Sequence, residues 1–164
     1  MVDQPKFPLT VTFTCEGRAV GKMRNELDVT MTEPMVERFS MATDEGPFHG
    51  GDATAPPPLA LFIAGLTGCI MTQIRAFAKR MDVVVDDLTV NAEVCWQWTP
   101  KGRIYETAPK SFHIDVLLDS PAPLEDQMAL VQAARKGCFV EQTLGVANTI
   151  THRIKSGDGY VTVD

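Results

Sequence analysis

The feature that most constrains the fold of this chain is an uncharged stretch that runs from Ala53 to Ile74. Its dense apolar part, Leu59 to Met71, is only 13 residues long, whereas a membrane span needs about 20 mostly apolar residues. Pro58 suits the first turn of a helix, where a missing N–H costs nothing. We therefore expect no membrane span, but a central helix from Pro58 to about Met81, wrapped by sheet or by another chain.

Alternating apolar and polar residues predict antiparallel strands on both sides of this helix. Before it, residues 9–14 and 27–32 are expected to form a hairpin with its turn at Gly17 to Gly21, followed by a weaker strand at 37–43. Further strands are expected at residues 88–98, 112–118, 147–154 and 160–163, with a turn at 99–102.

Two shorter helices are expected in the second half of the chain. An apolar stripe predicts one over residues 124–136, which Gly137 would end. Cys138 to Leu144 is expected to form the other, ended by Gly145. The order of elements indicates a single α+β domain over residues 1–164, with helices packed on an antiparallel sheet.

The charge of the chain argues against nucleic-acid binding. Lys and Arg total 15 against 21 Asp and Glu, a net charge of −6, and the basic residues are scattered. Binding to phosphates needs a basic face. Met1 to Lys6 lack the basic and apolar segments of a signal peptide, so we expect a cytoplasmic protein.

The cysteines are the main candidates for chemistry. No pair forms C-x-x-C, no histidine completes a zinc pattern, and no nucleotide-binding motif is present, so neither a metal nor a cofactor is expected. Cys69 lies in the middle of the expected long helix. It is interpreted either as a small core residue or as an active thiol. Cys138 is expected at a helix N-terminus, where N–H groups lower the pKa of a thiol. Cys15 and Cys95 lie in expected strands and are interpreted as structural.

Two segments resemble the OsmC/Ohr family. In the first, the glycine-rich loop at Gly50-Gly51 and the proline-rich helix start at Pro57-Pro58 lead to the helical Cys69. In the second, residues 133–144 are similar to the segment that carries the second cysteine of the family. The resemblance covers nearly the whole chain, and it implies an intertwined homodimer in which an antiparallel sheet wraps around a long central helix.

The resemblance also implies an activity, the reduction of organic or hydrogen peroxides in the oxidative stress response. Cys69 would be the peroxidatic thiol, which attacks the peroxide and becomes a sulfenic acid. Cys138 would be the resolving thiol, which condenses with it to a disulfide. An external dithiol of the lipoyl type would then restore both thiols.

In the family, an arginine near the reactive sulfur is held by a glutamate from the helix start. Here the helix starts Pro58-Leu59-Ala60-Leu61, without an acid, so the chain is interpreted as a divergent member. Arg18 in the first hairpin is the expected arginine, although the alignment could also place Cys15 there. Arg24 and Arg75 are alternatives.

The missing glutamate and the apolar helix start support a second hypothesis. The chain would then be a non-enzymatic OsmC-like protein that binds a small apolar ligand in the dimer cleft, with Cys69 merely lining that cleft.

Overall fold

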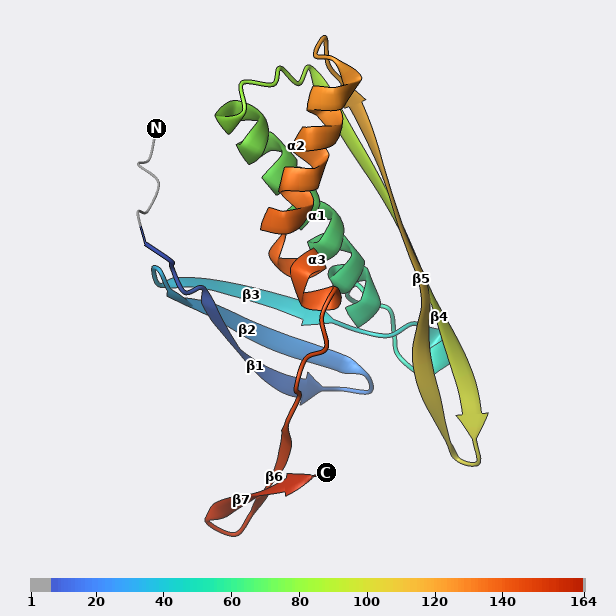
Figure 1. Ribbon diagram of the computed structural model, residues 1–164. Helices are drawn as coiled ribbons and strands as arrows, with labels where there is room; N and C mark the ends of the chain where they lie inside the picture. Colours follow the sequence, from blue (N-terminus) through green and yellow to red (C-terminus); the bar gives the residue numbers. More distant parts are fainter. Residues whose placement is uncertain (1–6, 164) are drawn as a thin grey trace. The chain divides into compact units, whose positions relative to one another are not determined.

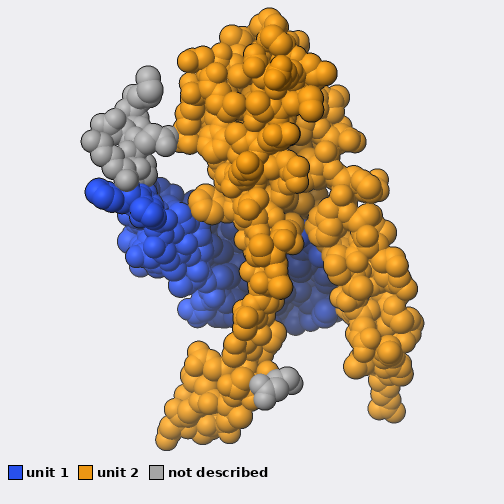
Figure 2. Space-filling model, viewed as in Figure 1, with its two compact units in different colours: residues 1–62 blue, residues 63–164 orange. Residues whose placement is uncertain are grey.

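The computed structural model describes residues 7–163 of the chain. The chain divides into two compact units, residues 1–62 and 63–164, which are described here one after the other (Figure 2). Residues 1–6, on which the expectation of no signal peptide depends, lie outside the described residues.

The first unit holds a three-stranded antiparallel sheet. Its strands, β1 (Thr12–Val20), β2 (Arg24–Glu33) and β3 (Glu37–Thr43), follow one another in space as they do in the sequence (Figure 1). The prediction of a turn at Gly17 to Gly21 is wrong, because Gly17 stays in the ladder and pairs with Leu27. The chain turns only at Gly21, whose φ of +70° is one that glycine adopts without strain.

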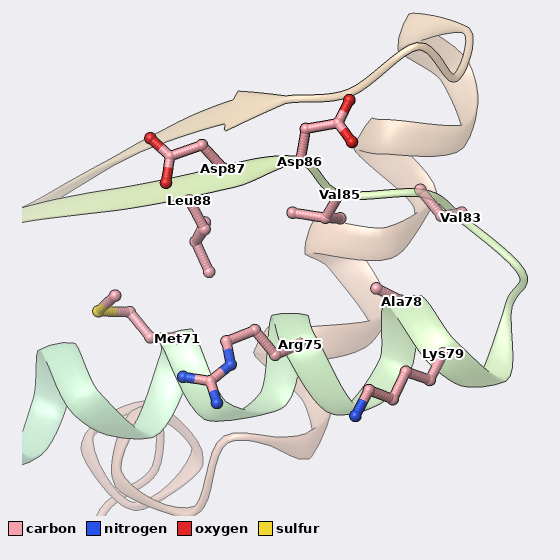
Figure 3. A pocket seen from close by; sticks show the side chains of 9 residues that line it. All are labelled: Met71, Arg75, Ala78, Lys79, Val83, Val85, Asp86, Asp87 and Leu88. Carbon is pink, nitrogen blue, oxygen red and sulfur yellow. The ribbon is translucent and has the colours of Figure 1, made fainter.

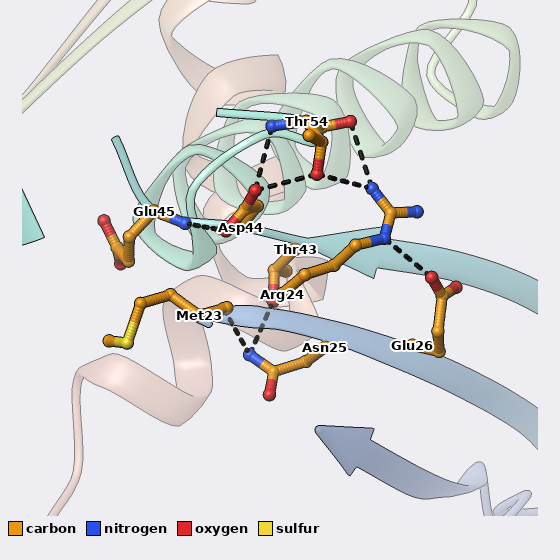
Figure 4. A network of polar contacts seen from close by, with 8 residues as sticks. All are labelled: Met23, Arg24, Asn25, Glu26, Thr43, Asp44, Glu45 and Thr54. Atoms are coloured by element: carbon orange, nitrogen blue, oxygen red, sulfur yellow. Dashed lines mark hydrogen bonds and ion pairs between the residues drawn. The ribbon is translucent and has the colours of Figure 1, made fainter. Parts of the chain in front are cut away.

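A buried carboxylate organises the loop that leads from β3 to the long helix. Asp44 is 2% exposed, and its Oδ2 accepts hydrogen bonds from the backbone N–H and the hydroxyl of Thr54, at 2.9 and 2.7 Å (Figure 4). Its Oδ1 accepts from the N–H of Glu45 at 2.9 Å. Arg24 on β2 donates to both oxygens of Thr54 and pairs with Glu26. These contacts fix the loop just before the helix begins.

The long helix α1 (Pro58–Arg80) begins at Pro58, as predicted. Within the described chain, however, it is buried only along one stripe, at Leu66, Ile70, Ile74 and Ala78. The four-residue spacing of this stripe is that of a helix with a single covered face. An added Cβ on Gly65 or Gly68 would meet no side chain or other element of the second unit within 4 Å. Within the described part of the second unit, no element therefore makes the close approach that these glycines permit.

The core of the second unit forms where α1, α2 (Leu124–Gly137) and β4 (Asp87–Lys101) meet. Leu130 and Ala134 of α2 pack with the buried stripe of α1, and Val90 closes the cluster from β4. Figure 1 shows α1 and α2 crossing beside the ribbon that β4 makes with β5. Cys138, at the end of α2, belongs to the same cluster.

The hairpin of β4 and β5 (Ile104–Asp119) is longer than the sequence predicts. The two strands pair as far as Lys101 and Ile104, so the expected turn at 99–102 and the expected strand start at residue 112 are wrong. Gly102 makes the turn, with φ of +64°. Pro109, which a sequence pattern would place outside a strand, is tolerated at a register shift opposite Cys95 and Trp96.

The chain ends in α3 (Phe139–Leu144) and a hairpin of β6 (His152–Ser156) and β7 (Gly159–Val163). These helices are the ones predicted, but the prediction that a strand begins at residue 147 is wrong. The side-chain amide of Asn148 donates to the carbonyl oxygens of Thr143 and Val146, at 2.6 and 2.9 Å. These bonds to the end of α3 hold the segment as a loop, and β6 begins only at His152.

The architecture is α+β, with antiparallel sheets and a long central helix, which confirms the predicted fold class. By length and composition alone, α1 is the one helix among the described residues that could cross a membrane. A core helix of a soluble protein has the same properties, and the buried stripe of α1 is consistent with that role.

Candidate functional site

Cys138 lies at the junction of α2 and α3, and its side chain is fully buried. It is the N-cap residue of α3, and its sulfur accepts the N–H of Glu141 at 3.5 Å. The preceding Gly137 packs closely against α1, because a Cβ there would lie 2.6 Å from Cζ of Phe77. Glycine thus allows the junction that carries Cys138 to lie against the helix that carries Cys69.

Burial raises the pKa of the Cys138 thiol to about 11, from an ordinary value of 9.0. The neighbouring Cys69 side chain acts in the same direction through a hydrogen bond and its charge, while the N–H groups of Glu141 and Val140 oppose it. The expectation that a helix N-terminus would lower the pKa of this thiol is therefore wrong. Desolvation outweighs the N–H groups, and Cys138 remains protonated near neutral pH.

Cys69 is half-buried on α1 and packs against the cluster that contains Cys138. Both residues are free thiols, and Cys69 lies close enough to contribute to the raised pKa of Cys138. The second unit therefore brings together the two cysteines that the sequence singled out. Cys15 on β1 and Cys95 on β4 are exposed free thiols.

The three arginines considered from the sequence have different surroundings. Arg18 is exposed on β1 and lies 4.0 Å from the carboxylate of Asp28. Arg24 is held by Glu26 and Thr54 in the loop network of the first unit. A role of Arg18 toward Cys69 stays a prediction.

Arg75 lies in a charged cavity of the second unit. This cavity measures about 460 Å³ and is bordered by Arg75 and Lys79 of α1 and by Asp86 and Asp87 (Figure 3). In the close view, the two basic side chains lie along α1, and the two carboxylates point away from the helix. No cysteine lines this cavity. Arg75 therefore faces surroundings different from those of the thiol pair.

A larger cavity, of about 560 Å³, lies near the thiol pair, although neither cysteine lines it. Ile70, next to Cys69 in the sequence, lines it, and so does Glu141, whose N–H is bonded to Cys138. Most of its lining is apolar and comes from α1, β5 and α2: Leu66, Ile70, Phe112, Ile114, Val116 and Val131. A small apolar molecule is the kind of ligand that such a lining favours.

Arg135 and Glu141 are the two charged residues of this cavity, and the sequence analysis did not single out either of them. The Nε of Arg135 donates to Oε1 of Glu141 at 2.9 Å, so the ion pair joins α2 to α3 across Cys138. The only signal in the sequence was a pair of opposite charges on either side of a candidate cysteine. Among residues 7–163, no group of three or more His, Cys, Asp or Glu side chains could hold a metal ion.

Comparison with known proteins adds a family and a set of solved structures. A family model described as OsmC-like protein matches residues 50–153. An OsmC-like hydroperoxide resistance protein from Jannaschia sp. CCS1 is 64% identical, over 93% of this chain and 98% of that one, with a TM-score of 0.66. No curated protein matches the chain.

More distant structures share the fold alone. An OsmC-like protein from Mycoplasma pneumoniae is 16% identical over 83% of this chain and 87% of that one, with a TM-score of 0.60. An organic hydroperoxide resistance protein OsmC from Legionella pneumophila is 22% identical over 81% and 88% of the two chains, with a TM-score of 0.52.

Proposed function

Since this chain belongs to the OsmC-like family, and since a 64% identical relative is a hydroperoxide resistance protein, we propose that it is a thiol-dependent hydroperoxide reductase. The observation that carries the proposal is the pair of free thiols that the fold brings together, Cys138 in the buried cluster and Cys69 packed against it. Family membership supports a soluble protein. A cytoplasmic location is part of the proposal, because the cycle needs reduced thiols.

The difference in exposure supports the proposed roles of the two thiols. Cys69 is half-buried and can be reached by a peroxide, whereas Cys138 is fully buried. The Cys69 thiolate attacks the terminal oxygen of the hydroperoxide, the O–O bond breaks, and the leaving alkoxide takes a proton to become an alcohol. Cys69 is thereby oxidised to a sulfenic acid.

Cys138 then closes the cycle from its protonated state. Its sulfur attacks the sulfenic sulfur of Cys69, a disulfide forms, and the sulfenic hydroxyl leaves with a proton as water. A dithiol of the lipoyl type reduces this disulfide by exchange and becomes a cyclic disulfide itself. The sum is one hydroperoxide and one dithiol converted to alcohol, water and an oxidised dithiol.

A peroxidase assay coupled to dihydrolipoamide tests this reaction with cumene hydroperoxide. The wild type is expected to turn over, and Cys69→Ser to lose turnover altogether. Cys138→Ser is expected to give at most a single turnover when dihydrolipoamide is limiting. In this variant the sulfenic acid of Cys69 has no resolving thiol within the protein with which to form a disulfide. An inactive wild type, folded and fully reduced, would contradict the proposal.

That negative outcome would favour a second function, the binding of an apolar ligand without turnover. The apolar cavity near the thiol pair, at about 560 Å³, is the observation in its favour. Turnover that is lost in Cys69→Ser would rule out this second function as the sole one.

We also propose that the chain forms a homodimer. Large apolar residues lie exposed on the hairpins of the second unit, among them Ile104 at 70% and Tyr160 at 61% exposed. An isolated two-stranded hairpin is at best marginally stable in water, so these faces need a cover. A Cβ added at Gly65 or Gly68 of α1 would meet no side chain or other element of the second unit within 4 Å, which leaves room for a second copy.

Sedimentation equilibrium at micromolar concentration tests the dimer against a monomer of 18.0 kDa. Gly68→Leu adds a side chain where the described chain has open space. It is expected to weaken the dimer while leaving the helix content unchanged. A wild type that stays monomeric would refute the dimer.

A further inference from the structure

Cys69, Gln73 and Phe77 form a row along one flank of α1. They are four residues apart, so their side chains project from the same side of the helix, with about 5–6 Å between neighbouring Cβ atoms. This side meets the junction of α2 and α3. A Cβ built on Gly137 would lie 2.6 Å from Cζ of Phe77 and 3.4 Å from Oε1 of Gln73. Cys69 packs against the cluster that contains Cys138. Gln73 therefore lies between the ring that packs the junction and the thiol pair.

The side-chain amide of Gln73 has no hydrogen-bond partner among residues 7–163, although the residue is half-buried. In the same part of the chain, Oε2 of Glu141 is the one buried side-chain polar atom without a partner, so neither end of the Gln73 amide is sealed from solvent. Helical side chains lean toward the N-terminus of the helix, over the residue four positions earlier. The Gln73 side chain therefore extends toward the turn that carries Cys69, where a small molecule can reach its amide.

The proposed reaction develops a charge at this place. As the Cys69 thiolate attacks the terminal oxygen of a hydroperoxide, the S–O bond forms, the O–O bond breaks, and negative charge grows on the oxygen that leaves. A hydrogen-bond donor held at that oxygen lowers the barrier. Gln73 is the only member of the row with N–H donors in its side chain. Arg75, the nearest arginine of α1 in the sequence, lines a cavity that contains no cysteine.

We propose that the NH2 group of Gln73 donates a hydrogen bond to the leaving oxygen of the hydroperoxide, which makes Gln73 a further catalytic residue beside Cys69. This inference rests on the proposed function and deepens it. A neutral amide gives up no proton, so the alkoxide takes its proton from water and leaves as an alcohol.

Two reagents separate this hydrogen bond from the reactivity of the thiol itself. Cumene hydroperoxide leaves an oxygen anion, whereas iodomethane has no oxygen and leaves iodide. The same Cys69 thiolate attacks both, so a change in its ionisation affects the two second-order rate constants alike, and their ratio reports the donor. The full chain carries Cys15→Ser and Cys95→Ser, since those exposed thiols would also react. Peptide mapping by mass spectrometry assigns each product to Cys69.

Gln73→Met keeps the length of the side chain and removes its donor. The rate with cumene hydroperoxide is expected to fall about tenfold, the worth of one hydrogen bond, while the rate with iodomethane stays within about twofold of the wild type. Gln73→Glu keeps the shape but offers only acceptors at neutral pH, and it is expected to lower the ratio at least as far. Gln132→Met, at an exposed glutamine of α2, is the matched control and is expected to change neither rate.

A Gln73→Met protein that slows both reagents equally, or slows neither, would overturn the inference. If that variant does not fold, Gln73→Glu decides in its place, and an unchanged ratio would have the same meaning. A wild type whose Cys69 does not react with cumene hydroperoxide would overturn the proposed function together with this inference. A wild type that turns over, with a ratio independent of the residue at position 73, would overturn this inference alone.

Discussion

Cys69 packs against the cluster that contains Cys138, and in this pair of thiols the buried Cys138 keeps its proton while the half-buried Cys69 is open to approach. This asymmetry makes a prediction about the order of oxidation. One equivalent of cumene hydroperoxide is expected to produce a Cys69–Cys138 disulfide, and in Cys138→Ser a sulfenic acid at Cys69 that dimedone traps. Peptide mapping by mass spectrometry distinguishes the two products.

The background for this experiment is the double variant Cys15→Ser, Cys95→Ser, because both of those thiols are exposed and would react with the same reagents. If dimedone were found on Cys138 in a Cys69→Ser protein as readily as on Cys69 in Cys138→Ser, the proposed difference between the two roles would be wrong.

The raised pKa of Cys138 predicts a loss of stability in alkaline solution. In the unfolded chain this thiol ionises near its ordinary pKa of 9.0, while in the folded protein it holds its proton to about 11. The unfolded state therefore binds fewer protons than the folded state between these pH values. The contribution of Cys138 to the free energy of unfolding is complete below pH 9 and is lost as the pH rises to about 11.

Thermal unfolding from pH 8 to 11, with a non-thiol reductant present, measures this effect. The melting temperature of the wild type is expected to fall more steeply than that of Cys138→Ala, which has no thiol to titrate at this position. Cys95→Ala, at an exposed thiol, is expected to follow the wild type. Parallel curves for the wild type and Cys138→Ala would show that burial does not hold this proton.

The contact of Gly137 with Phe77 makes the junction of α2 and α3 sensitive to a single methyl group. Alanine normally favours a helix over glycine by up to about 1 kcal/mol. Here its Cβ would lie 2.6 Å from the tip of the ring, so overpacking is expected to win and to destabilise the fold by about 1–3 kcal/mol. Urea denaturation of Gly137→Ala measures the change.

A double-mutant cycle separates this clash from any other cause. Phe77→Leu shortens the side chain that the new methyl group meets, so Gly137→Ala is expected to cost less in that background. A cost that is the same in both backgrounds would place the strain elsewhere.

Local chemistry allowed the sequence to predict the helices and the position of the thiols. Pro58 marks the start of α1, and glycines at 137 and 145 mark the ends of α2 and α3, because each acts through the backbone of its own helix. The strands were predicted less well, since their ends depend on a partner strand. A turn was expected from Gly17 and a strand only from residue 112, but the opposite strands keep Gly17 and residues 104–111 in their ladders.

The candidate site was predicted in part for the same reason. Cys69 and Cys138 could be recognised from their neighbours in the sequence, whereas the balance of burial against N–H groups at Cys138 depends on packing between α1 and α2. The ion pair of Arg135 and Glu141 crosses a helix junction without any periodic pattern. Only the fold reveals that both residues line an apolar cavity.

The buried carboxylate of Asp44 gives the opposite pH dependence to Cys138. Hydrogen bonds from Thr54 lower the pKa of Asp44 below its ordinary value of 3.8, with a smaller contribution from Glu45. The stability that Asp44 contributes is therefore present above about pH 4 and lost as the pH falls through the lower pKa of the folded protein.

In Asp44→Asn, one acceptor oxygen becomes an NH2 group that faces donors, so a lower melting temperature is expected at pH 7. Because the contribution of Asp44 fades in acid, the gap between wild type and variant should narrow from pH 5 to pH 3. Glu16→Gln on β1, which removes an exposed charge in the same unit, is expected to show neither effect. A gap that stayed constant down to pH 3 would mean that Asp44 acts through its shape and not through its charge.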